Sequence, residues 1–301
     1  MRILITGGSG FIGRNLAEQL APRYQIFAPT SAELNLLKEQ DVREYLGAHR
    51  FDVIVHAANT RSNRRVTAPP DMLDRNCRMF FNLARNQGSF GKMIHFGSGA
   101  EYGPRELLPS RVKEEYFDTR VPTDAYGFSK YICAKYIQVR GERVEGRGDI
   151  VELRLFAVFG PYEDYTVRFI SNACCRALKG LPIVLRQDVM FDYLYVKDLA
   201  EITGWFIEND PRHCAYNVCS GKPAALTDLA RMVAEVSGRN PDVRVAAGEL
   251  GAEYTGDNAR LLAELGGHQF WDLRCAISDL YSWYERHEAE IDAESLRFDE
   301  S

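Results

Sequence analysis

The sequence predicts an α/β fold in which helices cover both faces of a doubly wound parallel sheet. Two observations lead to this prediction. Short apolar runs alternate with amphipathic segments through the first 160 residues, and the first apolar run ends in a glycine-rich turn. Strands that alternate with helices form βαβ units, whose right-handed crossovers build a parallel sheet with both faces covered. Such a sheet binds its ligand at the carboxyl ends of the strands.

The expected elements follow in order from the N-terminus. Apolar runs bounded by turn residues predict strands. These runs occupy residues 2–6, 24–28, 52–56, 92–96 and 150–158. Apolar residues at helical spacing predict the helices between them. These segments occupy residues 11–20, 41–49, 72–87 and 122–140. The run at 150–158 (IVELRLFAV) is apolar enough for one strand buried on both faces.

After Gly160 and Pro161 the alternation becomes irregular. The strands expected there are residues 182–185 and 215–218, and the helices are residues 168–179, 227–237 and 276–287. This change of pattern predicts a smaller C-terminal α/β domain. We therefore expect one domain at 1–160 and a second at 161–301, with an approximate boundary and interleaved elements.

Charge and cysteine content exclude several classes of protein. The 301 residues include 37 Lys and Arg and 42 Asp and Glu, a net charge of −5 at pH 7. No nucleic-acid partner is expected, because phosphate binding needs clustered basic side chains. No apolar run has the length of a membrane span or signal peptide, so we expect a cytoplasmic protein without a membrane partner. Seven cysteines without a Cys-x-x-Cys pair predict free thiols and no metal site.

Three glycines stand where the first predicted strand turns into the first helix, in Thr-Gly-Gly-Ser-Gly-Phe-Ile-Gly. In a dinucleotide-binding turn, the first glycine allows a tight turn, the second lets the backbone approach a pyrophosphate, and the third lets helix and strand pack closely. Gly7, Gly10 and Gly13 match these places. The helix offers free N–H groups to the anion, beginning at Phe11 and Ile12. An ordinary strand–helix connection is the alternative, but the position inside a βαβ unit favours a Rossmann-type NAD(P)-binding domain.

The segment after the second strand bears on the choice of cofactor. An NAD-binding domain usually has Asp or Glu there, which holds the ribose 2′-hydroxyl. Here the strand at 24–28 is followed by Pro-Thr-Ser, and the first acid is Glu33. A carboxylate at the strand end would repel a 2′-phosphate, so its absence favours NADP(H), with NAD(H) as the alternative. Arg14 is the nearest cation in the sequence and a candidate ligand of the 2′-phosphate.

Tyr126 and Lys130 lie four residues apart in a predicted helix, so their side chains share one face. A free phenol is a weak acid at neutral pH, and an adjacent ammonium group stabilises the phenolate. Tyr126 can therefore exchange a proton with a carbonyl or alcohol while a nicotinamide exchanges hydride, and Lys130 can also hold the nicotinamide ribose. Ser98 follows a predicted strand and can hydrogen-bond the reacting oxygen. We predict that these three residues are catalytic; an exposed amphipathic pair is the alternative for the two helical ones.

Together these motifs resemble the extended short-chain dehydrogenase/reductases that act on nucleotide sugars, which include epimerases, 4,6-dehydratases and 4-keto-reductases of the GDP-fucose synthase type. The resemblance runs through nearly the whole chain. It includes the GxxGxxG turn, Ser-Gly-Ala-Glu-Tyr-Gly at 98–103, the Tyr-x-x-x-Lys pair and Val-Phe-Gly-Pro at 158–161. It implies a nucleotide-sugar substrate, a substrate-binding role for the C-terminal domain and a homodimer. It also implies further cofactor contacts, at Asn35, Leu36, Ala57, Ala58 and Asn76.

Departures from the family pattern narrow the expected reaction. The 4,6-dehydratases have Asp-Glu directly after the catalytic Ser or Thr, where this chain has Gly99 and Ala100. The GDP-fucose synthases have Cys at the place of Ala100 and a His that falls near Arg168. Without these proton carriers, single hydride transfer at C4 of the sugar remains. We expect NADP(H)-dependent 4-keto reduction, with an NAD-dependent C4 epimerase as the alternative and a non-catalytic, cofactor-bound sensor as a third reading.

Two further departures concern the substrate. The family usually has Asn at the place of Ala157 and Arg at the place of Phe191, and both contact the nucleotide diphosphate-sugar. Arg186 is a candidate replacement for the missing charge. Arg64, in the arginine-rich loop at 61–65, is a candidate phosphate ligand, with solvated surface as the alternative. The other predicted substrate-binding residues are Gly99, Ala100, Ala157 and Arg168.

Overall fold

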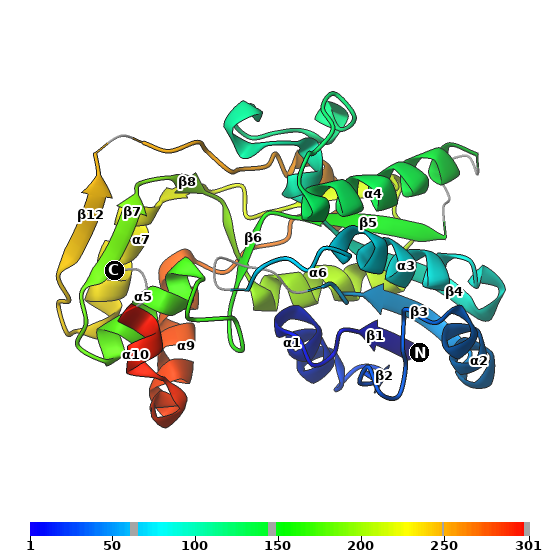
Figure 1. The fold of residues 1–301 in the computed structure, drawn as a ribbon, viewed down its shortest axis with the longest axis horizontal. Helices are drawn as coiled ribbons and strands as arrows, with labels where there is room; N and C mark the ends of the chain where they lie inside the picture. Colours follow the sequence, from blue (N-terminus) through cyan, green and yellow to red (C-terminus); the bar gives the residue numbers. More distant parts are fainter. Residues whose placement is uncertain (61–65, 144–148, 249, 298–301) are drawn as a thin grey trace.

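The computed structural model of the chain describes residues 1–60, 66–143, 149–248 and 250–297. At its centre lie six strands: β1 (Arg2–Thr6), β2 (Gln25–Phe27), β3 (Phe51–His56), β4 (Phe90–Ser98), β5 (Ile150–Leu155) and β10 (Ala215–Val218). They form one parallel sheet in the order β2-β1-β3-β4-β5-β10 (Figure 1). The predicted doubly wound α/β fold is confirmed.

Alternation along the strands buries both faces of this sheet. One face is covered by α1 (Phe11–Leu20) and α6 (Val196–Glu208), and the other by α2 (Glu39–His49), α3 (Met72–Ala84) and α4 (Ala125–Arg143). In β1, Ile3 and Ile5 belong to the apolar core of the first face, whereas Leu4 belongs to that of the second. All three side chains are fully buried.

The segment 150–158 is not one strand, contrary to the prediction. After β5 the chain leaves the main sheet, and β6 (Ala157–Phe159) pairs in parallel with β9 (Tyr193–Tyr195). At the break, the ring of Phe156 packs against that of Tyr254. A uniformly apolar run indicates burial but not the partner strand, so the sequence did not reveal this change of sheet.

The C-terminal part forms a smaller unit with its own apolar core, seen beside the sheet in Figure 1. Its strands are β7 (Ile183–Gln187), β8 (Met190–Phe191), β11 (Ala224–Ala225) and β12 (Val243–Ala247). Its helices are α5 (Phe169–Leu178), α7 (Leu226–Ser237), α9 (Leu273–Arg286) and α10 (Ala293–Leu296). β7 pairs with β12 and β8 with β11. Short 3₁₀ helices are η1 (Gln87–Ser89), η2 (Gly99–Tyr102), η3 (Arg105–Leu107), η4 (Glu114–Tyr116) and η5 (Glu288–Glu290).

Segments beyond residue 160 return to the main sheet. β10 is its sixth strand and pairs with β5, while α6 packs on α1. α8 (Ala259–Leu265) adds Leu261 to the same core. Residues 215–218 follow the expected boundary at 160 but lie in the main sheet, where Tyr216 and Val218 complete its core.

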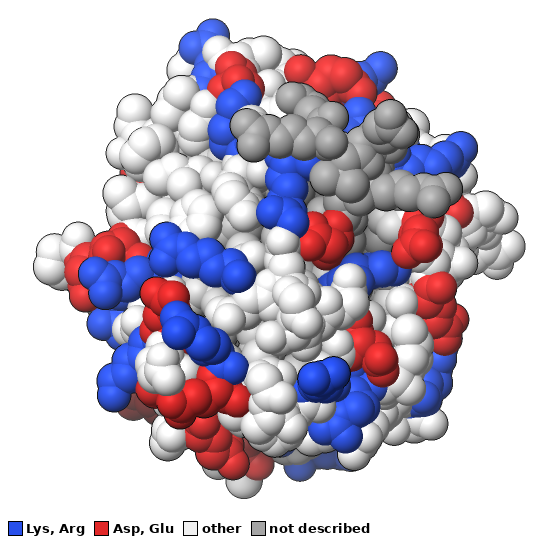
Figure 2. Space-filling view, turned by 90° about the vertical axis from the view of Figure 1, so that its right-hand side faces the viewer, with Lys and Arg blue, Asp and Glu red and all other residues white. Residues whose placement is uncertain are grey.

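Charges of both signs are mixed on the face shown in Figure 2. Helix α2 lies at this end of the molecule and carries the ion pair Arg43–Glu39, and α3 carries Arg78–Asp74. Pairs at this spacing partly neutralise one another, so the described residues of this face form no broad field of one sign. None of the described helices combines the length with the hydropathy that a membrane-spanning segment requires.

Candidate active site

The strand order reverses at β1, with β2 on one side of it and β3 on the other. At such a switch point, the loops after the two neighbouring strands leave a crevice for a ligand. The loops after β1 and β3 approach closely here: a Cβ added to Gly7, whose φ is +73°, would lie 2.8 Å from the nitrogen and Cα of Ala58. The first glycine of the motif is thus required by this approach and by its positive φ.

The other two glycines of the motif differ in their surroundings. A Cβ on Gly13 would lie 2.2 Å from the carbonyl oxygen of Gly7, whereas a Cβ on Gly10 would meet the same oxygen at 3.3 Å. Gly10 precedes α1, whose first turn holds no acidic residue, and no described side chain caps it. The N–H groups of Phe11 and Ile12 therefore face no acidic side chain from their own helical turn, and this loop fits the pyrophosphate of NAD(P).

Two charged side chains bear on the choice between NAD and NADP. Glu33 folds back toward β2, where its carboxylate accepts hydrogen bonds from the N–H (2.7 Å) and hydroxyl (2.9 Å) of Thr30. These bonds lower the pKa of Glu33, so a negative charge lies near the strand end where the sequence indicated none. The guanidinium of Arg14 lies 3.7 Å from the ring centre of Tyr162 and pairs with Glu18 at 3.1 Å, so it is already engaged.

The remaining residues predicted to contact the cofactor hold the surrounding loops in place. Asn76 accepts a hydrogen bond from the loop after β3 (2.9 Å) and donates one to the Ser129 hydroxyl (3.1 Å), which ties that loop to α4. The Asn35 side chain accepts a bond from the N–H two residues later (3.0 Å). Leu36 and Ala57 pack in the apolar cores of the two sheet faces.

The three predicted catalytic residues lie near the carboxyl end of β4. Ser98 ends this strand and caps η2, where its hydroxyl accepts a hydrogen bond from the N–H of Ala100 (3.2 Å). Tyr126 and Lys130 lie in the first turns of α4, which packs against η2. The Lys130 ammonium donates to the carbonyl of Phe96 at 2.7 Å and lies 6.0 Å from the ring centre of Tyr126. Ser98 and Lys130 are both buried.

A buried group of charges, which the sequence motifs did not reveal, adjoins Ser98. Arg154 pairs with the carboxylates of Glu101 and Glu152, and all three side chains are at most 3% exposed. Burial, and then repulsion by Glu152, raises the pKa of Glu101 well above its usual range. Glu101 also accepts the N–H of Ser98 at 3.2 Å, so the group supports the catalytic end of β4. The sequence signal that could have revealed this group is the pair Glu152 and Arg154 inside the otherwise apolar strand β5.

Further residues missed by the sequence reasoning lie beside η2. Tyr254 brings its hydroxyl to the backbone of Gly99, where an added Cβ would lie 2.6 Å from it. The Tyr254 ring contacts those of Phe156 and Phe191. The guanidinium of Arg105 lies 5.7 Å from the ring centre of Phe191. No motif pointed to Tyr254 or Arg105, because neither lies at a predicted strand end.

The structure separates the residues predicted to bind the substrate. Three of them adjoin Ser98 or the end of β5, namely Gly99, Ala100 and Ala157. Arg168 precedes α5, and its positive charge acts on Tyr254. Arg186 lies exposed on β7 in the smaller unit. Arg64 lies outside the described residues.

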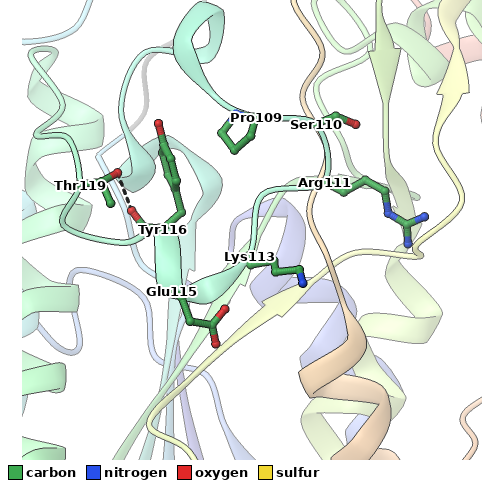
Figure 3. A pocket seen from close by; sticks show the side chains of 7 residues that line it. All are labelled: Pro109, Ser110, Arg111, Lys113, Glu115, Tyr116 and Thr119. Carbon is green, nitrogen blue, oxygen red and sulfur yellow. Dashed lines mark hydrogen bonds between the residues drawn. The ribbon is translucent and has the colours of Figure 1, made fainter.

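Figure 3 shows a separate surface hollow of 440 Å³, formed by the segment between η3 and α4. Arg111 and Lys113 contribute cations to its wall, and the Thr119 hydroxyl donates to the Tyr116 carbonyl at 2.8 Å. The three predicted catalytic residues are not among those that line it. The hollow is therefore distinct from the site at β4.

A glycine-rich turn at the switch point of a doubly wound sheet, with Ser98 at the end of β4 and Tyr126 and Lys130 on the adjoining helix α4, is typical of NAD(P)-binding enzymes of the short-chain dehydrogenase/reductase class. Residues 3–219 match the model of the NAD dependent epimerase/dehydratase family. The chain belongs to this family, as the resemblance in its sequence predicted, and is an NAD(P)-dependent enzyme.

Similar proteins include both epimerases and reductases. GDP-L-colitose synthase of Yersinia pseudotuberculosis is 23% identical over 94% of this chain and 98% of its own. UDP-glucose 4-epimerase from Thermotoga maritima shares the fold with a TM-score of 0.81 and 19% identity, over 95% of this chain and 99% of its own. The GDP-mannoheptose C4 reductase from Campylobacter jejuni, solved with NADP bound, gives 0.80 and 19%, over 94% and 98%. At these identities the solved structures establish the fold alone.

Proposed function

We propose that this enzyme uses NADPH to reduce the 4-keto group of a nucleotide-activated deoxysugar. The proposal is carried by the grouping of Ser98, Tyr126 and Lys130 beside two positions, Gly99 and Ala100, that have no proton-transferring side chain. Such a site supports proton and hydride transfer at a single carbon. Relatives named as a C4 reductase and a colitose synthase support the choice of substrate class.

In the proposed reaction, Ser98 donates a hydrogen bond to the keto oxygen, and Tyr126 gives that oxygen its phenolic proton as the alcohol forms. Bound NADPH supplies the hydride. Lys130 donates one of its three N–H groups to the carbonyl of Phe96. Its other two N–H groups remain for the cofactor ribose and for the phenolate left on Tyr126.

The direct test is turnover of a panel of 4-keto sugars linked to GDP, UDP, dTDP or CDP, with NADPH. Thermal-shift measurements select the nucleotide first, because a ligand that binds the folded state raises its apparent stability. We expect one NADPH to be oxidised for each alcohol formed. Isomerisation of a sugar without net oxidation of the nicotinamide would contradict the reductase proposal.

Replacement of Tyr126 by Phe keeps the ring and removes the proton donor. We expect kcat to fall by about 10²- to 10⁴-fold, the usual contribution of a positioned acid. The Kd for NADPH, measured by fluorescence titration, should be unchanged, because the substitution leaves the glycine loop intact. A variant that binds NADPH normally and also reduces the sugar at the wild-type rate would show that Tyr126 is not the donor.

The second candidate is an NAD-dependent C4 epimerase, and the position of Glu33 favours it. Its carboxylate on Thr30 places negative charge near the expected site of the ribose, where it opposes a 2′-phosphate. Protein that is purified with bound NAD, and that interconverts C4 epimers without added cofactor, would select the epimerase. Cofactor and nucleotide-sugar binding without turnover would select the non-catalytic sensor.

We also propose that the enzyme is a cytoplasmic homodimer. An exposed apolar side chain on α4 supports a partner surface on this helix: Val139 is 40% exposed. Sedimentation velocity should then give twice the monomer mass.

A further inference from the structure

Arg105 holds its guanidinium over the face of an aromatic ring. Its central carbon lies 5.7 Å from the ring centre of Phe191 in β8, within the range of a cation–π contact. Arg105 is half-buried at the start of η3, and no carboxylate of the described residues pairs with it. The ring attracts the charge but has no oxygen that could accept a hydrogen bond from the five N–H groups of the guanidinium. Within the described part of the chain, Arg105 therefore offers a positioned positive charge and unused N–H donors.

Two aromatic side chains connect Arg105 with the catalytic end of β4. The ring centre of Phe191 lies 5.9 Å from that of Tyr254. The hydroxyl of Tyr254 reaches the backbone of Gly99, where an added Cβ would lie 2.6 Å from the phenolic oxygen. Gly99 directly follows Ser98. Phe191 and Tyr254 therefore form a row of rings that leads from the predicted catalytic serine to Arg105.

This row of rings lies on the side of β4 that is away from the glycine-rich loop. In the sheet, β3 and β1 lie on one side of β4, and β5 lies on the other. Phe156, directly after β5, packs against Tyr254 with ring centres 5.2 Å apart. A cofactor at the glycine-rich loop occupies the first side. The second side, with Phe191 and Arg105, remains for the part of a substrate that extends beyond the sugar at Ser98.

We propose that Arg105 binds the diphosphate of the nucleotide-sugar substrate. A guanidinium can donate two parallel N–H groups to phosphate oxygens, and its contact with an aromatic face fixes the direction of these donors. Two other cations near the site are already engaged: Arg154 is buried between two carboxylates, and Lys130 donates to a backbone carbonyl. This inference rests on the substrate class proposed above and names a residue that selects for it.

The test measures the binding of GDP, UDP, dTDP and CDP by calorimetric titration. The protein is first saturated with NADP⁺, or with NAD⁺ if only that cofactor binds, because an empty glycine-rich loop could bind the same diphosphates. The probe is the nucleoside diphosphate that the wild type binds most tightly. We expect Arg105→Ala to raise the Kd of this probe about 10- to 100-fold, as the loss of hydrogen bonds to a charged group does. The matching nucleoside, which has no phosphate, should bind both proteins alike.

Arg85→Ala is the matched control. The guanidinium of Arg85 lies 5.9 Å from the ring centre of Phe81, a contact similar to that of Arg105 with Phe191. Arg85 directly follows α3 and precedes β4, so it lies at the opposite end of this strand from Ser98. We expect Arg85→Ala to bind the probe with the wild-type Kd, because it removes an equivalent contact far from the site.

Three results would overturn the inference: a wild-type Kd in Arg105→Ala, an equal loss in Arg85→Ala, or an equal loss for the nucleoside, which would assign Arg105 to the base. Melting temperatures identify any folding defect. If Arg105→Ala does not fold, Arg105→Gln, which keeps most of the side-chain length without the charge, takes its place in the same comparison.

Failure of the proposed reaction is a separate outcome. Wild-type protein that binds the probe through Arg105 but oxidises no NADPH would overturn the reductase proposal and support this inference. Wild-type protein that binds none of the four nucleoside diphosphates would overturn both the inference and the proposed substrate class.

Discussion

Gly10 and Gly13 lie almost one helical turn apart at the start of α1, yet they are glycines for different reasons. A methyl group on Gly13 would collide with the carbonyl of Gly7, whereas one on Gly10 has only that oxygen nearby, at 3.3 Å. We expect Gly13→Ala to destabilise the ligand-free protein by about 1–3 kcal/mol, as overpacking does. Gly10→Ala should leave that stability nearly unchanged and weaken NAD(P) binding, because its methyl group occupies the approach of the pyrophosphate.

Thermal unfolding with and without NAD(P) distinguishes the two variants. Gly13→Ala lowers the ligand-free melting temperature, and Gly10→Ala reduces the shift that the cofactor produces. Identical behaviour of the two variants would contradict this division of roles.

Local spacing was sufficient to predict which elements carry the three residues of the candidate site. Ser98 was recognised as a strand end, and Tyr126 and Lys130 as a helical pair. Tyr254 could not be found in this way, because its proximity to Ser98 depends on backbone pairing with β8. The position of Glu33 was also hidden, since its carboxylate turns back to Thr30 through side-chain hydrogen bonds.

Most elements of the first half could be predicted, because each combines a clear period with turn residues at its ends. The prediction at 92–96 found β4 but missed its ends, and the prediction at 150–158 merged β5 with β6. Hydrophobic periodicity records how deeply a residue is buried. It does not indicate which strand is the partner. The choice of partner is what separates β6, which pairs with β9, from the main sheet.

Helix α2 contains an exposed glycine, Gly47, with no atom within 4 Å of an added Cβ. Glycine inside a helix costs roughly 0.5–1 kcal/mol relative to alanine, because it loses more backbone entropy on folding. We expect Gly47→Ala to raise the free energy of unfolding by about that amount, measured by urea denaturation. Gly141→Ala in α4 is the control, since its Cβ would lie 3.0 Å from that of Cys214 and should offset the gain. An equal gain at both positions would contradict the steric argument.

The stability of the whole molecule is sensitive to acid through two buried histidines. His56 and His95 lie on adjacent strands with ring centres 5.3 Å apart. Burial, and then the charge of Lys130, lowers the pKa of His56 to about 3 and that of His95 well below its usual value. Below pH 6.5 the unfolded chain binds protons that the folded chain does not, so stability falls between pH 6.5 and about 3. For each histidine the slope approaches about 1.4 kcal/mol per pH unit.

His95→Leu tests this contribution. Both ring nitrogens of His95 lack a hydrogen-bond partner among the described residues, so leucine removes a buried polar group as well as a titrating one. We expect a higher free energy of unfolding at pH 7 and a smaller loss between pH 7 and 5, measured by urea denaturation. His213→Gln, at an exposed position, should keep the wild-type dependence. The same loss in His95→Leu and the wild type would exclude His95 as its source.

The return of β10 to the main sheet has a consequence for the order in which the protein is synthesised. The ribosome makes β5 first, and then β6, α5, β7, β8, β9 and α6, before it reaches β10. During that interval the outer edge of β5 has no partner strand, and an unpaired edge can join another chain. A nascent chain is therefore most exposed to misassembly late in translation, until residue 218 has left the ribosome and the last strand can close the sheet.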